Sequence, residues 1–399
     1  MYNIQKINQD WIYVGANNRR LTLFENIYPI PRGVSYNSYI LLDDKTVLMD
    51  TADETVQKEF LSNVKGALNG RNLDYLVVQH MEPDHCALIE DIMEKYPTTT
   101  LVCNQKTLTM IGQFFDIDVN DRVMIVKEGD SLNTGRHTLS FVMAPMVHWP
   151  EVMMTYDATD KILFSADAFG SFNAIDGNLY ADEVNYEAEW LADARRYYAN
   201  IVGKYGMPVQ TVLKKASTLD IQMICPLHGL IWRKNLSWIL DKYQKWSTYT
   251  PEDKSVVIAY ASIYGFTEEV ANMLAFKLAQ KGIKNIKVYD VSSTHPSWIV
   301  SEAFRVSHLV FASSSYNAGL FPAMETVLLD LKAHALNNRT ISLMENGSWA
   351  PTAMGCMKSI LADLKNITYI EPEIHIKSAM KQHQSEELDK LTDEIVKSM

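Results

Sequence analysis

Cysteine, long apolar runs and positive charge are all scarce in this chain of 399 residues. Its four cysteines form no CxxC pair, which argues against a disulfide scaffold, a thiolate zinc finger and a cysteine-bound iron–sulfur cluster. No apolar run reaches the ~18 residues that a membrane helix needs, and the first residues lack the basic and apolar regions of a secretion signal. We therefore expect a cytoplasmic protein without a membrane anchor.

Lysine and arginine total 37 against 48 aspartate and glutamate residues, which gives a formal charge of −11. So acidic a chain is a poor partner for nucleic acid or an anionic membrane, because both attract cationic surfaces. Its hydrophobic content of 47% is that of an ordinary globular protein, and its length exceeds what one core usually supports. We expect a two-domain enzyme.

The predicted boundary lies near residues 246–254, where Pro251 and small polar or charged residues separate two differently organised halves. The predicted domains are residues 1–250 and 254–399. In the second, apolar strands alternate with amphipathic helices, and Pro296 opens one of these helices. Five strand–helix units predict a doubly wound parallel sheet of flavodoxin-like type, with strand order 2-1-3-4-5. The expected strands are 255–262, 287–291, 308–315, 340–346 and 370–376.

The first half has short β-rich runs with helices between only some of them, such as the helix expected over 56–68. Such blocks of strands indicate an α/β sandwich of two sheets rather than one parallel sheet. The expected strands are 46–51, 73–80, 99–104, 122–126, 137–145 and 161–167.

Residues of metal-binding type follow several of these strands. The pattern H-x-E-x-D-H comes directly after the apolar run LDYLVV, and three later segments each end with one further histidine or aspartate. One such residue alone is more often a hydrogen-bonded structural group, but seven in this order favour a site with two metal ions bridged by a carboxylate. The candidate ligands, which are also the candidate catalytic residues, are His80, Glu82, Asp84, His85, His148, Asp167 and His228.

Three loops of the second half are expected at the carboxyl edge of its sheet. The loop after the first strand reads SIYGFT and opens a helix, where backbone N–H groups, hydroxyls and the helix dipole favour a phosphate. Neither a P-loop lysine nor GxGxxG is present, so a mononucleotide fits better than ATP or a dinucleotide. Loops 313–322 and 345–351 each carry one aromatic, Tyr316 and Trp349, which could stack on a flavin ring.

Together the three loops look like the FMN site of flavodoxins. The candidate FMN contacts are Ser262, Ile263, Tyr264, Gly265, Phe266, Thr267, Ser314, Ser315, Tyr316, Asn317, Ala318, Gly319, Asn346, Gly347, Ser348 and Trp349.

The histidine and carboxylate order resembles that of the metallo-β-lactamase superfamily, whose fold is an αββα sandwich. Its hydrolases usually have a histidine where this chain has Glu82. A carboxylate there favours iron over zinc. Joined to a flavodoxin-like half, the pattern resembles the flavodiiron proteins over essentially the whole chain.

The resemblance implies that His80, Glu82 and His148 bind one iron and that Asp84 and His228 bind the other. It implies that Asp167 bridges the two irons, while His85 is a ligand in some members and displaced in others. It also implies reduction of O2 to water or of NO to N2O, and no motif here separates these substrates. One further residue, Tyr197 or Tyr198, is a candidate to donate a proton or hydrogen bond near the metals.

The family's partners are also implied. We expect a head-to-tail homodimer or dimer of dimers, in which FMN of one subunit meets the irons of the other. No CxxC pairs for a rubredoxin iron follow the second half, so we expect an external electron donor such as rubredoxin or reduced deazaflavin F420. Two alternatives stay open: a zinc hydrolase of metallo-β-lactamase type with an accessory flavodoxin domain, and an electron-transfer or sensor flavoprotein with a vestigial metal site.

Overall fold

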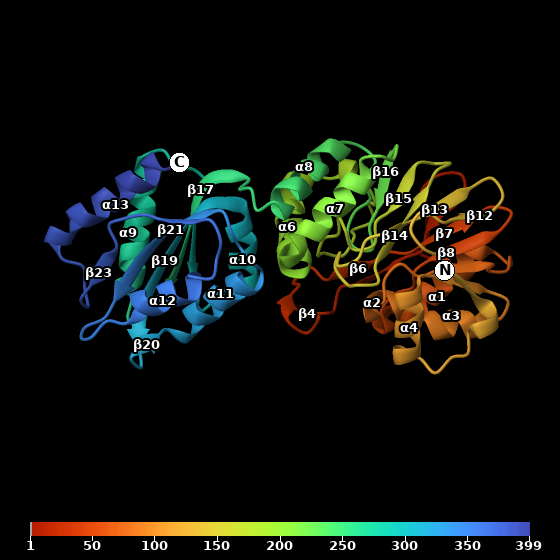
Figure 1. Ribbon diagram of the computed structural model, residues 1–399, viewed down its shortest axis with the longest axis horizontal. Helices are drawn as coiled ribbons and strands as arrows, with labels where there is room; N and C mark the ends of the chain where they lie inside the picture. The colour runs from red at the N-terminus through yellow and green to blue at the C-terminus, as the bar shows by residue number, and fades with distance from the viewer. Residues whose placement is uncertain (1) are drawn as a thin grey trace. The chain divides into compact units, whose positions relative to one another are not determined.

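The computed structural model describes residues 2–399, and its internal contacts divide the chain into two compact units (Figure 1). The first unit ends at Tyr198 and resumes over Met207–Gln244. The second comprises Ala199–Gly206 and Lys245–Met399. The change of unit after Gln244 lies close to the boundary predicted from the sequence, whereas the short segment Ala199–Gly206 was not anticipated. Among the described residues, no helix is both long and apolar enough to cross a membrane.

The first unit is built on two sheets. Seven strands form one sheet in the order β1-β2-β7-β8-β9-β10-β11. They are β1 (Gln5–Lys6), β2 (Trp11–Tyr13), β7 (Tyr39–Leu42), β8 (Thr46–Met49), β9 (Tyr75–Val77), β10 (Thr100–Cys103) and β11 (Val123–Ile125). Five strands form the other in the order β12-β13-β14-β15-β16. They are β12 (Ser131–Asn133), β13 (Thr138–Met143), β14 (Met153–Asp157), β15 (Ile162–Phe164) and β16 (Met223–Cys225).

Helices cover both outer faces of this pair of sheets, which confirms the predicted αββα sandwich (Figure 1). Helices α1–α4 lie on one side and α6–α8 on the other. Helix α1 shows how a helix packs on a sheet: Phe60, Val64 and Leu68 recur at helical spacing, so they form one apolar face, which is buried. The helix ends at Asn69, whose backbone is in the left-handed region. The helices are α1 (Gln57–Leu68), α2 (Pro83–Cys86), α3 (Ile89–Lys95), α4 (Gln105–Phe114), α5 (Tyr186–Glu189), α6 (Leu191–Tyr197), α7 (Gly206–Ala216) and α8 (Leu236–Ser247).

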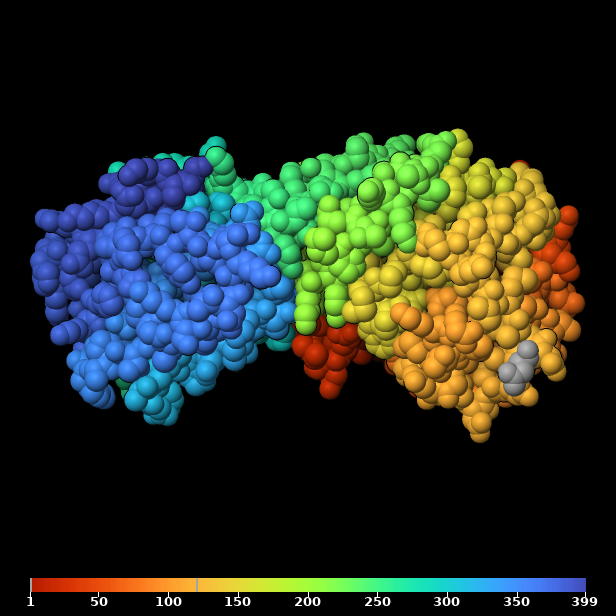
Figure 2. All heavy atoms as spheres, viewed as in Figure 1, coloured from red at the N-terminus to blue at the C-terminus, as the bar shows by residue number. Residues whose placement is uncertain are grey.

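Two small hairpins complete the first unit. One pairs β3 (Ala16–Asn18) with β6 (Val34–Tyr36), and the other pairs β4 (Leu23–Phe24) with β5 (Tyr28–Pro29). The β4–β5 hairpin projects from the surface of its unit, as both the ribbon and the space-filling view show (Figure 1, Figure 2). Sequence reasoning found neither these hairpins nor the N-terminal strands, which are too short to show a periodic pattern.

The second unit has the predicted doubly wound sheet, and its order β18-β17-β19-β21-β22 confirms 2-1-3-4-5. Strands β17, β19 and β21 form a parallel core, and helix α10 begins at Pro296 as expected. The strands are β17 (Asp253–Ala261), β18 (Lys287–Asp290), β19 (Val306–Tyr316), β20 (Gly319–Leu320), β21 (Arg339–Asn346), β22 (Ile367–Tyr369) and β23 (Ile374–Ile376). The helices are α9 (Phe266–Gln280), α10 (Pro296–Arg305), α11 (Pro322–Ala333), α12 (Ala353–Leu361) and α13 (Ser385–Lys397).

Candidate functional site

The seven predicted metal ligands come from four segments of the first unit and lie together. His80 follows β9, Glu82 caps the start of α2, and Asp84 and His85 lie in the first turn of that helix. His148 lies in the β13–β14 connection, and Asp167 and His228 follow the parallel strands β15 and β16. Because these strands end at one edge of the sandwich, side chains far apart in sequence converge there. Their donor atoms form two adjacent groups.

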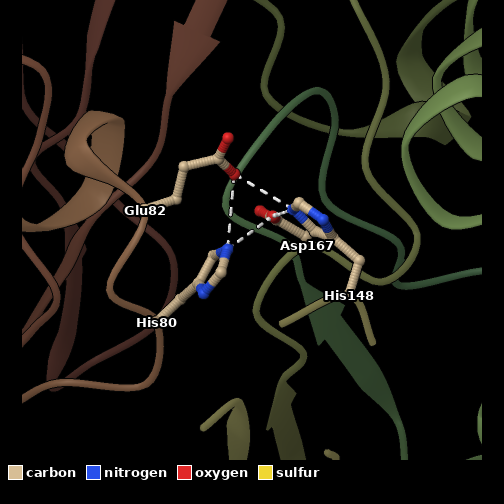
Figure 3. Close-up of side chains that lie close together, drawn as sticks. All are labelled: His80, Glu82, His148 and Asp167. Carbon is tan, nitrogen blue, oxygen red and sulfur yellow. Dashed lines mark hydrogen bonds and ion pairs between the residues drawn. The ribbon is translucent and has the colours of Figure 1, made fainter. Parts of the chain in front are cut away.

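The first group, here called position 1, is made by His80, Glu82, His148 and one oxygen of Asp167 (Figure 3). His80 Nε2 lies 3.4 Å from Glu82 Oε2 and 3.2 Å from Asp167 Oδ2. His148 Nε2 lies 3.0 Å from Glu82 Oε2 and 3.1 Å from Asp167 Oδ2. Ligand atoms bound at about 2.0–2.2 Å to one ion lie about 3.0–3.5 Å from one another, so these separations suit a shared metal ion.

The second group, position 2, is made by Asp84, His85, His228 and the other oxygen of Asp167. His228 Nε2 lies 3.2 Å from Asp84 Oδ2, 3.0 Å from His85 Nε2 and 3.7 Å from Asp167 Oδ1. His85 Nε2 lies 3.3 Å from Asp167 Oδ1, so this histidine faces position 2 in the structure. The two oxygens of Asp167 thus point to different positions, which is the arrangement of a bridging carboxylate.

These donor atoms are buried and lack ordinary partners. Within residues 2–399, His80 Nε2, both carboxylate oxygens of Asp84 and both of Asp167 make no hydrogen bond of good geometry, although none is exposed to solvent. Burying polar atoms without partners is costly, and metal coordination removes that cost. The set is also made of imidazole nitrogens and carboxylate oxygens without a thiolate, which suits a non-haem iron pair.

The electrostatics of the metal-free site follow from this crowding. Burial alone would lower the pKa of His80 and His148, but Asp167 and Glu82 outweigh it and raise the pKa of His148 to about 9 and that of His80 well above its usual value. Burial alone would raise the pKa of Asp167, but His80 and His85 hold it well below its usual range. When no metal is bound, the histidines therefore hold protons, and metal binding displaces these protons.

Three groups that sequence reasoning missed hold the ligands in place. Glu151 Oε1 accepts hydrogen bonds from His80 Nδ1 at 2.8 Å and from the Met81 amide at 2.9 Å. His228 Nδ1 donates to the Ser35 carbonyl at 2.7 Å. Asp50 accepts from the amide of Gln79, which directly precedes His80. Only Glu151 had a signal in the sequence, since a carboxylate three residues after His148 was visible in HWPE.

The expected tyrosine is placed by the structure. The ring of Tyr197 lies 5.4 Å from that of His228, and within residues 2–399 its buried hydroxyl has no hydrogen-bond partner. Burial raises the pKa of this hydroxyl well above its usual value, and the nearby charges of Asp167 and Glu82 raise it further. Tyr198 faces away and packs against Tyr243, with ring centroids 5.0 Å apart. Of the two candidates, Tyr197 lies at the metal site.

A cavity of about 380 Å³ adjoins the metal positions and includes Glu82 and Asp84 in its wall. The β4–β5 hairpin supplies its other side through Leu23, Phe24 and Glu25. Phe24 is buried, and its ring lies 5.5 Å from that of His228. The hairpin therefore covers the metal ligands with the side chains of Leu23 and Phe24 and with the carboxyl group of Glu25, which interacts with Glu82, while leaving space for a small molecule.

The second unit has a cavity of about 560 Å³ at the carboxyl ends of β17, β19 and β21. Its volume is within the range of small-molecule and cofactor sites. Residues of all three predicted loops line it, but Gly265, Tyr316 and Gly319 do not. The lining residues are Ser262, Ile263, Tyr264, Phe266, Thr267, Ser314, Ser315, Asn317, Ala318, Asn346, Gly347, Ser348, Trp349, Ala350 and Ser378. Ala350 and Ser378 were not anticipated.

One end of this cavity lies at the start of helix α9. Helix α9 starts at Phe266, and Gly265 before it has a φ of 91°, which only glycine adopts easily. The Gly265 amide donates to Ser262 Oγ at 3.0 Å, and the hydroxyls of Thr267 and Ser314 lie 2.9 Å apart. Hydroxyl groups and the start of a helix, where the dipole favours an anion, therefore lie together at this end, and no lysine or arginine is among the described residues that line the cavity.

The aromatic residues are distributed differently from the prediction. Trp349 lines the cavity and is 82% exposed, and Tyr264 lines it and is 88% exposed. Tyr316 instead packs against Phe321, with ring centroids 5.9 Å apart. Two exposed aromatic side chains at the mouth of a cavity are suited to stack on a planar ring.

Several known proteins are similar to this chain. Residues 34–229 match a family profile described as ODP family beta lactamase. The chain is 31% identical over 346 residues to the anaerobic nitric oxide reductase flavorubredoxin of Vibrio vulnificus, which covers 84% of this chain and 68% of that protein. It is 34% identical over 297 residues to an uncharacterised protein of Methanocaldococcus jannaschii, covering 74% of this chain and 73% of that one.

Solved structures extend the likeness to the whole chain. The rubredoxin oxygen:oxidoreductase of Desulfovibrio gigas superposes with a TM-score of 0.92 at 25% identity, covering 99% of this chain and 98% of that one. The flavodiiron protein of Giardia intestinalis has the same fold, with a TM-score of 0.93, 24% identity and coverage of 100% and 97%.

Proposed function

This chain belongs to the flavodiiron family, and we propose that it reduces O2 to water, NO to N2O, or both, at a diiron centre supplied with electrons through FMN. It is an oxidoreductase. The observation that carries the proposal is the position of Asp167, whose two oxygens each face one group of buried, unsatisfied donors. Two groups that share one carboxylate indicate a site for two metal ions, and Glu82 favours iron over zinc there.

The chain's residues would hold two irons as follows. His80, Glu82 and His148 bind at position 1, Asp84, His85 and His228 at position 2, and Asp167 bridges them. Glu82 adds a negative charge where a hydrolase of the related superfamily has a neutral imidazole, which favours iron over zinc. When bound, the irons provide the place where O2 or NO accepts electrons, and FMN provides electrons singly or in pairs.

The reactions also need protons and a dry, small site. O2 takes four electrons and four protons to give two waters, while two NO take two of each to give N2O and one water. The ring of Tyr197 lies 5.4 Å from that of His228, and its hydroxyl, which has no hydrogen-bond partner within residues 2–399, can donate a hydrogen bond or proton at this site. Phe24 and Leu23 border the adjoining cavity, so the β4–β5 hairpin limits access to small molecules such as diatomic gases.

FMN would occupy the cavity of the second unit. Its phosphate would accept hydrogen bonds from the start of α9 and from the Thr267 and Ser314 hydroxyls. Its ring would lie against Trp349 and Tyr264, and loop 346–348 would contact its polar edge. That loop is held by Ser378, which exchanges two hydrogen bonds with Asn346.

The test of this function is anaerobic reduction of protein reconstituted with iron and FMN, followed by separate additions of O2 and NO. The expected result is rapid reoxidation of flavin and iron by one or both gases, with water or N2O as product. A protein that binds two zinc ions but no iron, or that shows no flavin spectrum after reconstitution, would contradict it. The ratio of the two rates gives the substrate preference.

Electron delivery and assembly are part of the proposal. Electrons come from an external donor, rubredoxin or reduced deazaflavin, and these are separated by measuring FMN reduction by each in turn. The functional state is a head-to-tail homodimer or dimer of dimers, as the resemblance to the flavodiiron family implies.

Co-expression of two inactive variants tests the dimer. An Asp167→Ala chain would keep FMN, and a Thr267→Arg chain, with a bulky side chain in the phosphate site, would keep the metals. In a head-to-tail dimer, each mixed pair contains one complete FMN–iron couple, so activity returns. Mixed dimers without activity would exclude transfer between subunits.

The cysteines bear on the cellular location of the protein. All four cysteines are free thiols, which suits a reducing compartment. We place the protein in the cytoplasm, and cell fractionation tests this.

A further inference from the structure

The two metal positions differ in the group behind their histidines. At position 1, His80 turns Nδ1 to the carboxylate of Glu151, 2.8 Å away. At position 2, His228 turns Nδ1 to a neutral carbonyl, that of Ser35, 2.7 Å away. Within residues 2–399, the Nδ1 of His85 has no partner. Position 1 therefore has a carboxylate hydrogen-bonded behind one of its histidines. Within the described residues, position 2 has no such carboxylate.

Glu151 is fixed in this role by its surroundings. The residue is 1% exposed, and its Oε1 also accepts from the Met81 amide at 2.9 Å. Its own carbonyl accepts from the Asn104 side chain, so both main chain and side chain are held. Across the described chain its only ion-pair partner is His80, and its Oε2 makes no hydrogen bond. The negative charge of Glu151 therefore acts on position 1 through the imidazole ring of His80.

A carboxylate that accepts the second ring N–H of a metal-bound histidine fixes the ring and makes it a stronger donor. At position 1 this effect adds to the carboxylate of Glu82. Within residues 2–399, position 2 has one terminal carboxylate, Asp84, and neither of its histidines hydrogen-bonds a carboxylate through Nδ1. More negative charge binds a cation more tightly and stabilises its higher oxidation state.

We propose that Glu151 is a positioning residue that makes the two metal positions unequal. Through His80, it makes position 1 the tighter iron site and the one that holds the ferric ion when the pair carries one ferric and one ferrous ion. This inference rests on the proposed diiron function. It assigns to each chain a fixed order in which its two irons load and are reduced.

The wild-type protein gives the first test. Crystals of metal-free protein are soaked with less than one equivalent of Fe(II), and anomalous scattering at the iron edge is compared at the two positions. The expected result is stronger density among His80, Glu82 and His148. Equal density, or stronger density beside His228, would overturn the inference. Absence of iron at both positions would instead contradict the proposed function, so the two failures are distinguishable.

The second test uses Glu151→Gln, which keeps an oxygen to accept from His80 and Met81 but removes the charge. Fe(II) affinity is expected to fall about 10–100-fold at position 1 and to stay unchanged at position 2. The maximum yield of the mixed ferric–ferrous signal, followed by electron paramagnetic resonance during a redox titration, is expected to decrease because the two irons become more alike. An unchanged signal in a folded variant would overturn the inference.

The matched control is Asp157→Asn. His137 Nδ1 bonds to Asp157 Oδ2 at 2.8 Å, and both side chains are fully buried, so this pair repeats the chemistry of His80 and Glu151. The pair lies outside the two metal positions, but His137 also belongs to a third group of possible ligands with Asp10 and Asp160, so the affinities compared are those measured at positions 1 and 2. Circular dichroism verifies the fold of both variants. The control should leave Fe(II) affinity and the mixed-valence signal as in the wild type; if it changes both as Glu151→Gln does, the effect is one of stability and the inference is wrong.

Discussion

The metal site and the flavin cavity are built in opposite ways. The metal site gathers seven charged or ionisable side chains, all buried, with several atoms unsatisfied within the described chain. The candidate flavin cavity is lined mostly by small neutral residues and by three exposed aromatics, Tyr264, Phe266 and Trp349, and several of its polar groups are paired with one another. A site for metal ions is therefore specified by side-chain type, whereas the flavin site is specified by loops at a sheet edge. We therefore expect substitutions at the metal site and at the flavin cavity to have different effects.

Removing the bridging carboxylate should have the largest effect. Asp167→Ala deletes a donor from both positions, so we expect metal content to fall by at least one ion per chain and gas reduction to fall at least about 1000-fold. FMN content should stay near one per chain because the cavity is in the other unit. Metal analysis, flavin absorbance and oxygen-electrode rates measure all three. Oxidase turnover that survives without metal would mean that the flavin alone reacts.

The metal-free site should show a distinctive pH dependence. The pKa of His148 is raised to about 9 in the folded chain against an ordinary 6.5, because Glu82 and Asp167 outweigh its burial. A raised pKa stabilises the fold below pH 6.5, and that contribution is lost as the pH rises to 9, by up to about 3 kcal/mol. Urea unfolding of metal-free protein at both pH values measures it.

The metal-loaded protein is the control for that experiment, since metal replaces the proton on His148 and should remove most of the loss. Equal losses with and without metal would show that His148 is not the group responsible.

FMN affinity should depend on the aromatic side chains of the cavity rather than on charged ones. Trp349→Ala removes a ring that lines the cavity, and we expect FMN affinity to fall about 10-fold. Tyr316→Ala removes a ring that packs on Phe321 outside the lining, so affinity should change less than about 2-fold. Fluorescence titration with FMN measures both. The reverse order would restore the stacking role that the sequence predicted for Tyr316.

The smallest effect is expected at the edge of the metal site. Tyr197→Phe removes one hydroxyl from beside His228 and should lower turnover about 2–10-fold, the range of a single hydrogen bond. Metal and FMN content should not change. Tyr198→Phe is the matched control because it lies one residue on and packs away from the site. Equal rates for Tyr197→Phe and the wild type would exclude a proton or hydrogen-bond role.

The contrast between the two sites also explains what the sequence could predict. His80, Glu82, Asp84 and His85 lie within six residues, so their chemistry was visible as a motif. The parallel register of β15 and β16 brings Asp167 and His228 together, as expected of residues that follow strands. The doubly wound order of the second unit followed from its regular alternation.

What could not be predicted depends on contacts between distant segments. Ser35 and His228 meet across 193 positions, and Glu151 reaches His80 across 71. Neither bond leaves a periodic trace. The contact between Tyr316 and Phe321 could not be predicted for a similar reason, and Tyr316 does not line the cavity in the structure. The β4–β5 hairpin was missed because two-residue strands carry no alternation.

The most direct test of the account is the product of O2 reduction by anaerobically reduced protein loaded with iron and FMN. Because Asp167 couples two irons in one buried site, we predict that O2 is converted to water, with four electrons consumed per O2 and almost no hydrogen peroxide. Asp167→Ala should instead react slowly and give peroxide from the flavin. Stoichiometric peroxide from the wild type, at the same rate as from Asp167→Ala, would contradict the central claim.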